Sequence, residues 1–350
     1  MLKKLFLFSF LCMSLSADQV EVISNGVSSI EYYNEIFEKN HIDANAVEAH
    51  VDQFGKEFKK NRSILSKWMR KLSLENSNPI PFKKDVRKLV LMNIPVHFYR
   101  DHHVAKLPQE KMVLFMWEPV IRLRKMYNPK LHRCFSKIYT WDDELVDNER
   151  YFKFFYPVLQ PMISSVIPFE EKKFCTLISG CVHNAHTFSR KYPNELYTQR
   201  IQAIEFFEKM GEEGFEFYGR GWGNTSYKTY RGPCADKLDV LKNYRFSICY
   251  ENCRDVPGYI TEKIFDCFAA GNVPIYWGAN NVSDYIPSDC FIDRRNFATM
   301  DDLYAFLKTM SQHEYEGYLI RIKTFLQSEQ AQLFSKENFE KTFLEAIAEK

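Results

Sequence analysis

The sequence predicts an α/β protein built from two domains. Short, uninterrupted apolar runs alternate along the chain with stretches of helical periodicity, which is typical of buried parallel strands joined by crossover helices. A chain of 350 residues is longer than a single domain with one hydrophobic core usually is, so two domains are expected. Hydrophobic residues make up 45% of the chain and the formal net charge is only +2, so a disordered chain and a nucleic-acid-binding surface are both excluded.

The N-terminus predicts a secretory signal. Residues 1–17 begin with a basic start, continue with an apolar run from Leu5 to Leu15 and end in small residues. This run is shorter than the ~20 residues that a membrane-spanning helix needs, so we expect a signal peptide or a short signal anchor. Residues 18–83 follow as an N-terminal extension that is partly helical and carries no recognisable chemistry.

A first Rossmann-like domain is expected over residues 84–168. Its apolar runs predict buried strands at Lys88–Met92, Met112–Met116 and Lys137–Thr140, and a proline-rich linker closes it. Glu118 follows the second of these strands. Because ligands of open α/β sheets bind beyond the carboxyl ends of the strands, Glu118 is a candidate functional residue.

A second Rossmann-like domain is expected over residues 169–335, followed by a C-terminal helix over 336–350. The chain is predicted to be helical from Met300 onward, and two further helices are expected at 195–210 and 260–270. The expected strands are 174–178, 215–218, 244–250, 273–277 and 290–293.

The segment from Tyr244 to Phe297 carries the predicted chemistry. An apolar strand ends in Glu251-Asn252, and a loop then leads into a helix that begins near Tyr259. The N-terminus of that helix offers free N–H groups and the positive end of a dipole to a diphosphate. Lys263 adds a positive charge, and Glu262 can accept hydrogen bonds from sugar hydroxyls. Acidic residues in a first helical turn are also favoured without any ligand, so a structural role stays open for each residue taken singly.

This segment resembles the donor-binding motif of the α-1,3-fucosyltransferases, glycosyltransferase family 10. The matching strings are Tyr244-Arg245-Phe246, Glu251-Asn252, Gly258-Tyr259-Ile260-Thr261-Glu262-Lys263-Ile264, Ala270-Gly271-Asn272-Val273-Pro274-Ile275-Tyr276-Trp277-Gly278 and Cys290-Phe291-Ile292-Asp293. The resemblance implies a GT-B fold, in which a cleft separates two Rossmann-like domains and the second domain binds GDP-fucose. It also implies that the donor is lined by Arg200, Asn252, Tyr259, Glu262 and Lys263, with Arg200 on the diphosphate.

The resemblance further implies an inverting transfer, which needs a base to take the proton of the acceptor hydroxyl. The family places its candidate base at the end of a strand of the first domain, and Glu118 occupies that place here. Trp117 and Pro119 replace the neighbours that the family usually has. Five other residues of the first domain are rival bases, namely His97, His102, His103, Asp101 and Asp142.

The predicted activity is transfer of L-fucose from GDP-fucose to a hydroxyl of an N-acetylglucosamine- or glucose-containing glycan, carried by a glycoprotein, glycolipid or lipopolysaccharide. The alternatives are another nucleotide sugar on the same fold, or a non-catalytic protein that binds a glycan or nucleotide. The sequence contains no DxD motif, so we expect no required metal, with Mn²⁺ or Mg²⁺ at most stimulatory. We expect membrane association in the secretory pathway, in a Golgi-like lumen, or in a cell envelope; the alternative is the cytoplasmic face of a bacterial membrane.

Overall fold

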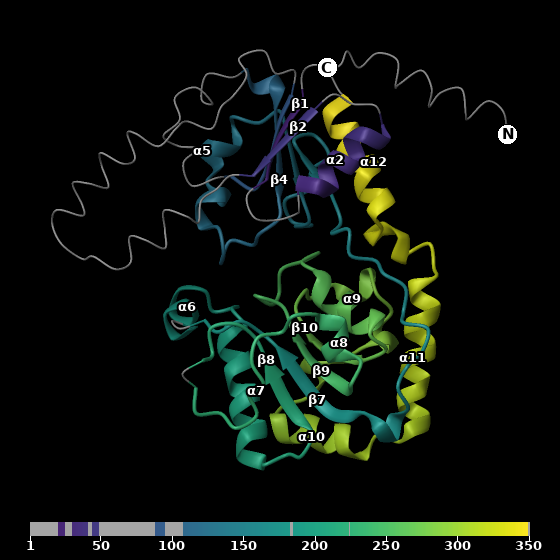
Figure 1. The fold of residues 1–350 in the computed structure, drawn as a ribbon. Helices are drawn as coiled ribbons and strands as arrows, with labels where there is room; N and C mark the ends of the chain where they lie inside the picture. The colour runs from purple at the N-terminus through teal and green to yellow at the C-terminus, as the bar shows by residue number, and fades with distance from the viewer. Residues whose placement is uncertain are drawn as a thin grey trace. The chain divides into compact units, whose positions relative to one another are not determined.

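The computed structural model describes residues 20–24, 30–40, 44–48, 88–94, 108–182, 185–223 and 225–348. The chain divides into two compact units (Figure 1). The first comprises the described parts of Met1–Thr140, Leu145–Lys153 and Glu340–Lys350, and the second comprises Trp141–Glu144 and Phe154–Phe339. The predicted signal segment 1–17, together with His97, Asp101, His102 and His103, lies outside the described residues.

The first unit contains a parallel sheet of six strands in the order β2-β1-β3-β4-β5-β6. The strands are β1 (Val20–Ser24), β2 (Ala44–Glu48), β3 (Lys88–Met92), β4 (Met112–Met116), β5 (Lys137–Thr140) and β6 (Tyr151–Lys153). Three of them, β3 to β5, have the bounds that the apolar runs predicted. Every residue of β3 and β4 is buried, as expected for central strands of a parallel sheet.

Two strands of residues 18–83, β1 and β2, belong to this sheet. β1 pairs with both β2 and β3, so it lies inside the sheet and its residues are not an appended extension. Its sequence, Val-Glu-Val-Ile-Ser, contains the polar residues Glu21 and Ser24 and is not a continuous apolar run. The first domain therefore begins well before the expected boundary at residue 84. A prediction based on continuous apolar runs could not find β1.

The C-terminal helix α12 (Lys336–Ala348) packs on helix α2 (Ile30–Lys39) (Figure 1). The Phe343 ring lies 5.6 Å from the Tyr33 ring and 6.0 Å from the Phe37 ring, measured between centroids. Lys39 Nζ is 2.9 Å from Glu340 Oε2. The end of the chain thus returns to the first unit, about 300 residues after α2.

The second unit contains a parallel sheet of five strands in the order β11-β10-β9-β7-β8. They are β7 (Lys173–Ile178), β8 (Phe215–Tyr218), β9 (Tyr244–Tyr250), β10 (Val273–Trp277) and β11 (Ile292–Asp293). The last strand is shorter than the predicted 290–293, because Ser288–Cys290 form a 3₁₀ turn. β9, the strand that precedes the predicted donor residues, is the central strand, so its carboxyl end lies in the middle of that edge of the sheet.

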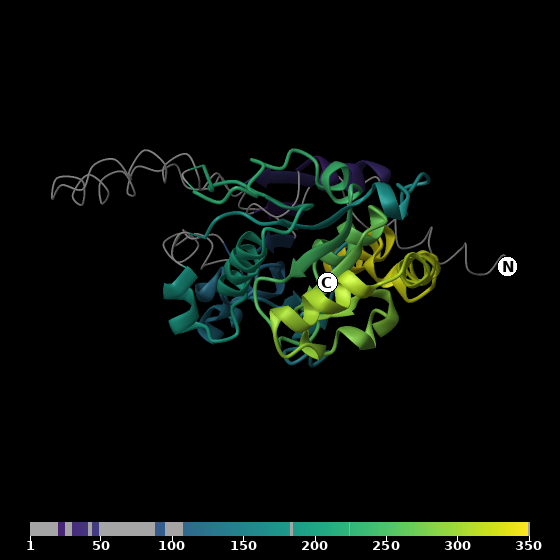
Figure 2. The same ribbon diagram turned by 90° about the horizontal axis from the view of Figure 1, so that it is seen from below.

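Helices cover both faces of this second sheet (Figures 1 and 2). Residues of α7 (Tyr197–Met210) and α10 (Met300–Thr309) share one hydrophobic core with alternate strand residues such as Phe246 and Ile248. Residues of α8 (Lys237–Leu241), α9 (Glu262–Ala269) and α11 (Gln312–Leu326) share another with Cys249. This alternation is the period-two pattern of a strand that is buried on both faces.

The proline-rich segment before residue 169 belongs to the second unit. The backbone N–H groups of Val158 and Leu159 donate to the Phe334 carbonyl oxygen at 2.9 and 2.8 Å, and that of Ile163 donates to the Ala269 carbonyl oxygen at 2.8 Å. The segment therefore lies along the helices of the second unit as a strap. The second domain starts earlier than the expected boundary at residue 169.

Candidate donor site

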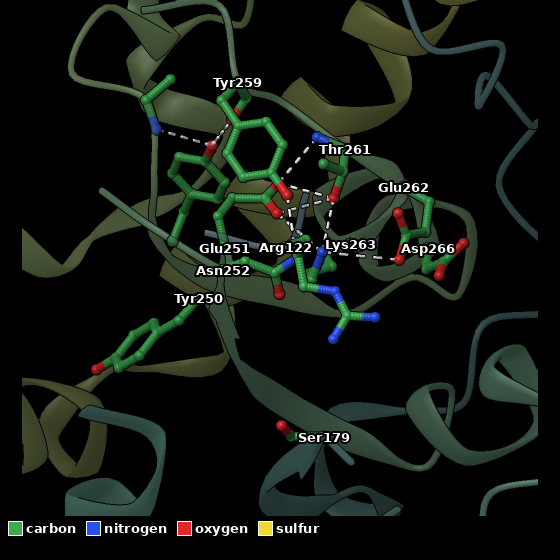
Figure 3. A network of polar contacts seen from close by, with 12 residues as sticks. Arg122, Ser179, Tyr250, Glu251, Asn252, Tyr259, Thr261, Glu262, Lys263 and Asp266 are labelled. Atoms are coloured by element: carbon green, nitrogen blue, oxygen red, sulfur yellow. Dashed lines mark hydrogen bonds and ion pairs between the residues drawn. The ribbon is translucent and has the colours of Figure 1, made fainter. Parts of the chain in front are cut away.

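The candidate site lies at the carboxyl end of β9 and the beginning of α9 (Figure 3). β9 ends at Tyr250, and Glu251 and Asn252 follow directly. A loop then turns through Gly258, whose φ of 79° favours glycine, and its N–H donates to Asn281 Oδ1 at 2.8 Å. This is the edge of a parallel sheet at which α/β proteins bind their ligands.

Glu251 is the most buried charged group of the site, with no exposed surface. Its Oε1 accepts a hydrogen bond from the Thr261 backbone N–H at 2.8 Å, and its two oxygens lie 2.9 and 2.8 Å from the Thr261 hydroxyl. Lys263 Nζ donates to Oε2 at 2.8 Å. The carboxylate thus links the end of β9 to the first turn of α9.

Lys263 and Glu262 occupy the first turn of α9, and both are charged. Burial would lower the pKa of Lys263, but Glu251 and Glu262 outweigh that effect and raise it. Burial would raise the pKa of Glu262, but the charges of Lys263 and Lys237 lower it. The side chain of Lys263 is 24% exposed and that of Glu262 is 43% exposed, so a ligand can reach both.

Arg200 joins the site from the first turns of α7. Its buried guanidinium donates from Nη2 to the Tyr250 carbonyl oxygen at 2.7 Å and to Asn252 Oδ1 at 3.2 Å. Asn252 Nδ2 in turn donates to the Tyr259 hydroxyl at 3.1 Å. A chain of hydrogen bonds therefore runs from α7 through the end of β9 to the loop before α9. The ring of Tyr259 also packs against Trp141, with 4.5 Å between the ring centroids.

The structure thus brings the predicted donor residues together at one edge of the second sheet. Two cations, Arg200 and Lys263, lie near enough for their charges to interact. Such an edge, with two fixed cations and a helix N-terminus, can bind a diphosphate, and the amide, hydroxyl and carboxylate groups can bind a sugar.

Glu118 lies in the first unit, directly after β4. Its backbone N–H and that of Trp117 donate to Asn93 Oδ1 at 3.1 and 2.8 Å, and Asn93 adopts a left-handed φ of 62°. Its carboxylate is about one third exposed and lies 3.8 Å from Arg122 Nε. The rival carboxylate Asp142 is nearly buried in the second unit, and its Oδ1 accepts the backbone N–H of Glu144 at 3.1 Å.

The sequence reasoning missed three residues that shape the site. Glu251 and Thr261 hold Lys263, and Ser179, after β7, accepts a hydrogen bond from Arg200 Nη1 at 3.3 Å. Glu251 and Thr261 stand inside the matched motif, which was a signal that they belong to the site. Ser179 had no such signal, because it reaches Arg200 only through the fold.

Within the described ranges, no group of three or more His, Cys, Asp or Glu side chains is arranged to hold a metal ion. No described helix has both the length and the apolar composition to cross a membrane.

The fold is that of a GT-B glycosyltransferase. A solved α1,3-fucosyltransferase with GDP-fucose superposes with a TM-score of 0.51 and 16% identity, over 96% of this chain and 92% of that one. A glycosyltransferase from Rickettsia africae superposes with a TM-score of 0.53 and 9% identity, over 95% and 98% of the two chains. The predicted fold class is therefore confirmed.

The family follows from the sequence. The model of the "Glycosyltransferase family 10 (fucosyltransferase) C-term" domain matches residues 169–343, which is half of the chain. The chain belongs to glycosyltransferase family 10, the fucosyltransferases, and is by family a glycosyltransferase, as its motifs predicted. The match contains the whole of the candidate donor site.

Individual relatives match over shorter stretches. An α-(1,4)-fucosyltransferase of Arabidopsis thaliana is 40% identical over 71 residues, which is 20% of this chain and 18% of that protein. An α-(1,3)-fucosyltransferase of Helicobacter pylori is 32% identical over 79 residues, 23% of this chain and 16% of that protein. A bovine 4-galactosyl-N-acetylglucosaminide 3-α-L-fucosyltransferase is 28% identical over 149 residues, 42% and 35% of the two chains. The chain thus spans only about a third or less of the length of these relatives.

Proposed function

We propose that this protein transfers L-fucose from GDP-fucose, with inversion, to a hydroxyl of an N-acetylglucosamine- or glucose-containing glycan. One observation carries the proposal: the side chains of Arg200, Asn252, Tyr259, Glu262 and Lys263 meet at the carboxyl edge of the second sheet. They do so inside the segment that matches the fucosyltransferase family. The names of two relatives support the sugar and the donor, since one acts on galactosyl-N-acetylglucosaminide and one was solved with GDP-fucose.

The charges of the site suit departure of GDP. As the bond to fucose breaks, negative charge develops on the diphosphate, and fixed cations stabilise it most effectively where water is scarce. Arg200 is buried and Lys263 is three-quarters buried, so both are held at the edge before the donor arrives. Because these two cations provide charge for the diphosphate, we propose that no metal is required and that Mn²⁺ or Mg²⁺ is at most stimulatory.

Glu118 is the proposed base. It follows β4 at the carboxyl edge of the first sheet, and its backbone is fixed by Asn93. An inverting transfer needs one base, which takes the proton of the acceptor hydroxyl as the hydroxyl attacks the sugar carbon. The acceptor is proposed to be a glycoprotein, glycolipid or lipopolysaccharide, and the site of action a membrane of the secretory pathway or cell envelope.

A donor screen tests the proposal. Purified protein would be titrated calorimetrically with GDP and UDP, and release of GDP, UDP and CMP from their nucleotide sugars would be measured with mixed glycans. We expect GDP to bind more tightly than UDP, and GDP-fucose to be the donor that is turned over. Tighter binding of UDP would instead support another nucleotide sugar on the same fold. Binding of GDP without turnover on any glycan would support a non-catalytic binding protein.

A chelator experiment tests the metal independence separately. Turnover should persist in excess EDTA, because Arg200 and Lys263 supply the positive charge that a metal supplies in other transferases. Complete loss of turnover in EDTA, restored by Mn²⁺, would contradict this part of the proposal.

A further inference from the structure

We propose that Glu251 is a positioning residue, which fixes the ammonium group of Lys263 where it can bind the diphosphate of the donor. This inference rests on the proposed function, and it adds a residue whose effect on the donor passes through another side chain. Figure 3 shows the arrangement, with the Lys263 ammonium beside the Glu251 carboxylate and the Thr261 hydroxyl.

The hydrogen bonds of the ammonium group support the inference. An ammonium group has three N–H donors. One donates to Glu251 Oε2 and another to the Thr261 hydroxyl oxygen, each at 2.8 Å. Glu262 Oε1 is 3.7 Å away, which is an ion-pair distance and too long for a hydrogen bond. Within the described part of the chain, one donor of Lys263 therefore remains for a ligand, and its direction is set by the other two.

The carboxylate itself is rigidly held. The Glu251 backbone N–H donates to the Trp277 carbonyl oxygen at 2.8 Å, and the Thr261 backbone N–H donates to Oε1 at 2.8 Å. Gly278 lies so close that a Cβ there would be 2.6 Å from Glu251 Cγ. A flexible lysine stem usually leaves its charge mobile. Here the stem ends against a carboxylate that cannot move, so the entropy lost on binding a diphosphate is reduced.

A structural role alone makes a different prediction. Lys263 could serve only as the counterion that a fully buried carboxylate needs. Loss of Glu251 would then weaken the fold, and any effect on the donor would be the same whether or not Lys263 was present. If Glu251 acts through Lys263, its effect on the donor must disappear once the ammonium is removed. A double-mutant cycle separates these cases.

The cycle uses Glu251→Gln, Lys263→Met and the double variant of the full chain. GDP affinity would be measured by calorimetry at pH 7, with urea unfolding of each protein as the measure of folding. We expect Glu251→Gln to weaken GDP binding about tenfold or more in the wild-type background, and less than about twofold in the Lys263→Met background. The KM for GDP-fucose should rise with it. As a matched control, Asp239→Asn removes an exposed carboxylate whose ion pair with Lys242 lies outside the donor site, and it should change GDP affinity less than about twofold.

A second variant keeps the test decisive if Glu251→Gln does not fold. Thr261→Val removes the hydroxyl that receives the second N–H of Lys263 and keeps the backbone N–H that Glu251 uses. It should weaken GDP binding about threefold or more, again only when Lys263 is present. Equal losses in both backgrounds would overturn the positioning role while leaving the proposed function intact. A wild-type protein that bound no GDP would overturn both.

Discussion

Glu216 offers a test of how the second sheet is held together, at the edge opposite to the donor site. It lies near the start of β8 and is bound by three side chains from neighbouring segments. Lys173 Nζ is 2.7 Å from Oε2, Arg231 Nε is 2.6 Å from Oε1, and the Tyr244 hydroxyl donates to Oε2. Burial would raise the pKa of Glu216, but the hydrogen bonds from Lys173, Tyr244 and Arg231 outweigh it and lower the pKa to about 2.

The lowered pKa gives the expected magnitude. The ordinary pKa is 4.5, so the shift is about 2.5 pH units, and at 1.36 kcal/mol per unit the charged form contributes about 3 kcal/mol to folding. Because the pKa is lower in the folded state, this contribution is fully present above pH 4.5 and decreases as the pH falls towards 2. At pH 3 about 1 kcal/mol should remain. The side chain is only 11% exposed, so solvent screening reduces these values little.

Urea unfolding of wild type and Glu216→Gln at pH 7 and pH 3 measures the effect. The variant should be less stable by about 3 kcal/mol at pH 7, and the difference should shrink by more than half at pH 3. As a control, Glu213→Gln removes an exposed carboxylate close by and should change stability by less than about 0.5 kcal/mol at either pH. A Glu216→Gln deficit that was the same at both pH values would refute the reasoning, since it could not then come from the charge.

Three further predictions concern the site. Lys263→Ala should weaken GDP-fucose binding by about 2–4 kcal/mol, measured by calorimetry, and normal binding would mean that α9 does not face the donor. Glu118→Gln should lower kcat about 100-fold with donor affinity unchanged, and near-full kcat would remove Glu118 from the mechanism. Gly278→Ala should lower stability by about 1–3 kcal/mol and weaken GDP binding, because its Cβ would collide with the Tyr276 hydroxyl and would lie 2.6 Å from Glu251 Cγ. An unchanged urea midpoint would contradict this close approach.

The strands made of continuous apolar runs could be predicted from the sequence, whereas β1, β2 and β6 were not. β3, β4 and β5 were found with their observed bounds, because a central parallel strand needs apolar side chains on both faces. β1 contains the polar residues Glu21 and Ser24, so it gave no continuous apolar run, whereas β11 was predicted but with two residues too many at its start. Domain boundaries were harder still, since the strap before residue 169 joins the second unit through backbone hydrogen bonds that any sequence can make.

The donor site could be predicted as a set of positions, and its internal pairing could not. Asn252, Tyr259 and Lys263 stand in one continuous motif, so their order along the chain indicated a common site. The bond between Arg200 and Asn252 joins residues 52 positions apart, and it exists only because α7 packs beside β9. Whether Glu118 is the base stays a prediction. A base is defined by its contact with the acceptor hydroxyl, and Glu118 belongs to the first unit and not to the donor site of the second.

The pairing at the donor edge also determines how the site attracts its ligand. Among the described residues, the ion pairs around Lys263 and the guanidinium of Arg200 bring together three cations and three carboxylates, namely Arg200, Lys237, Lys263, Glu251, Glu262 and Asp266. These charges cancel, and the whole chain has a net charge of only +2, so long-range attraction contributes little to donor binding. Affinity must then come from short-range contacts with cations that are already in place. Because Lys263 is held by a buried carboxylate and Arg200 by backbone and side-chain oxygens, the edge meets that requirement before a nucleotide arrives.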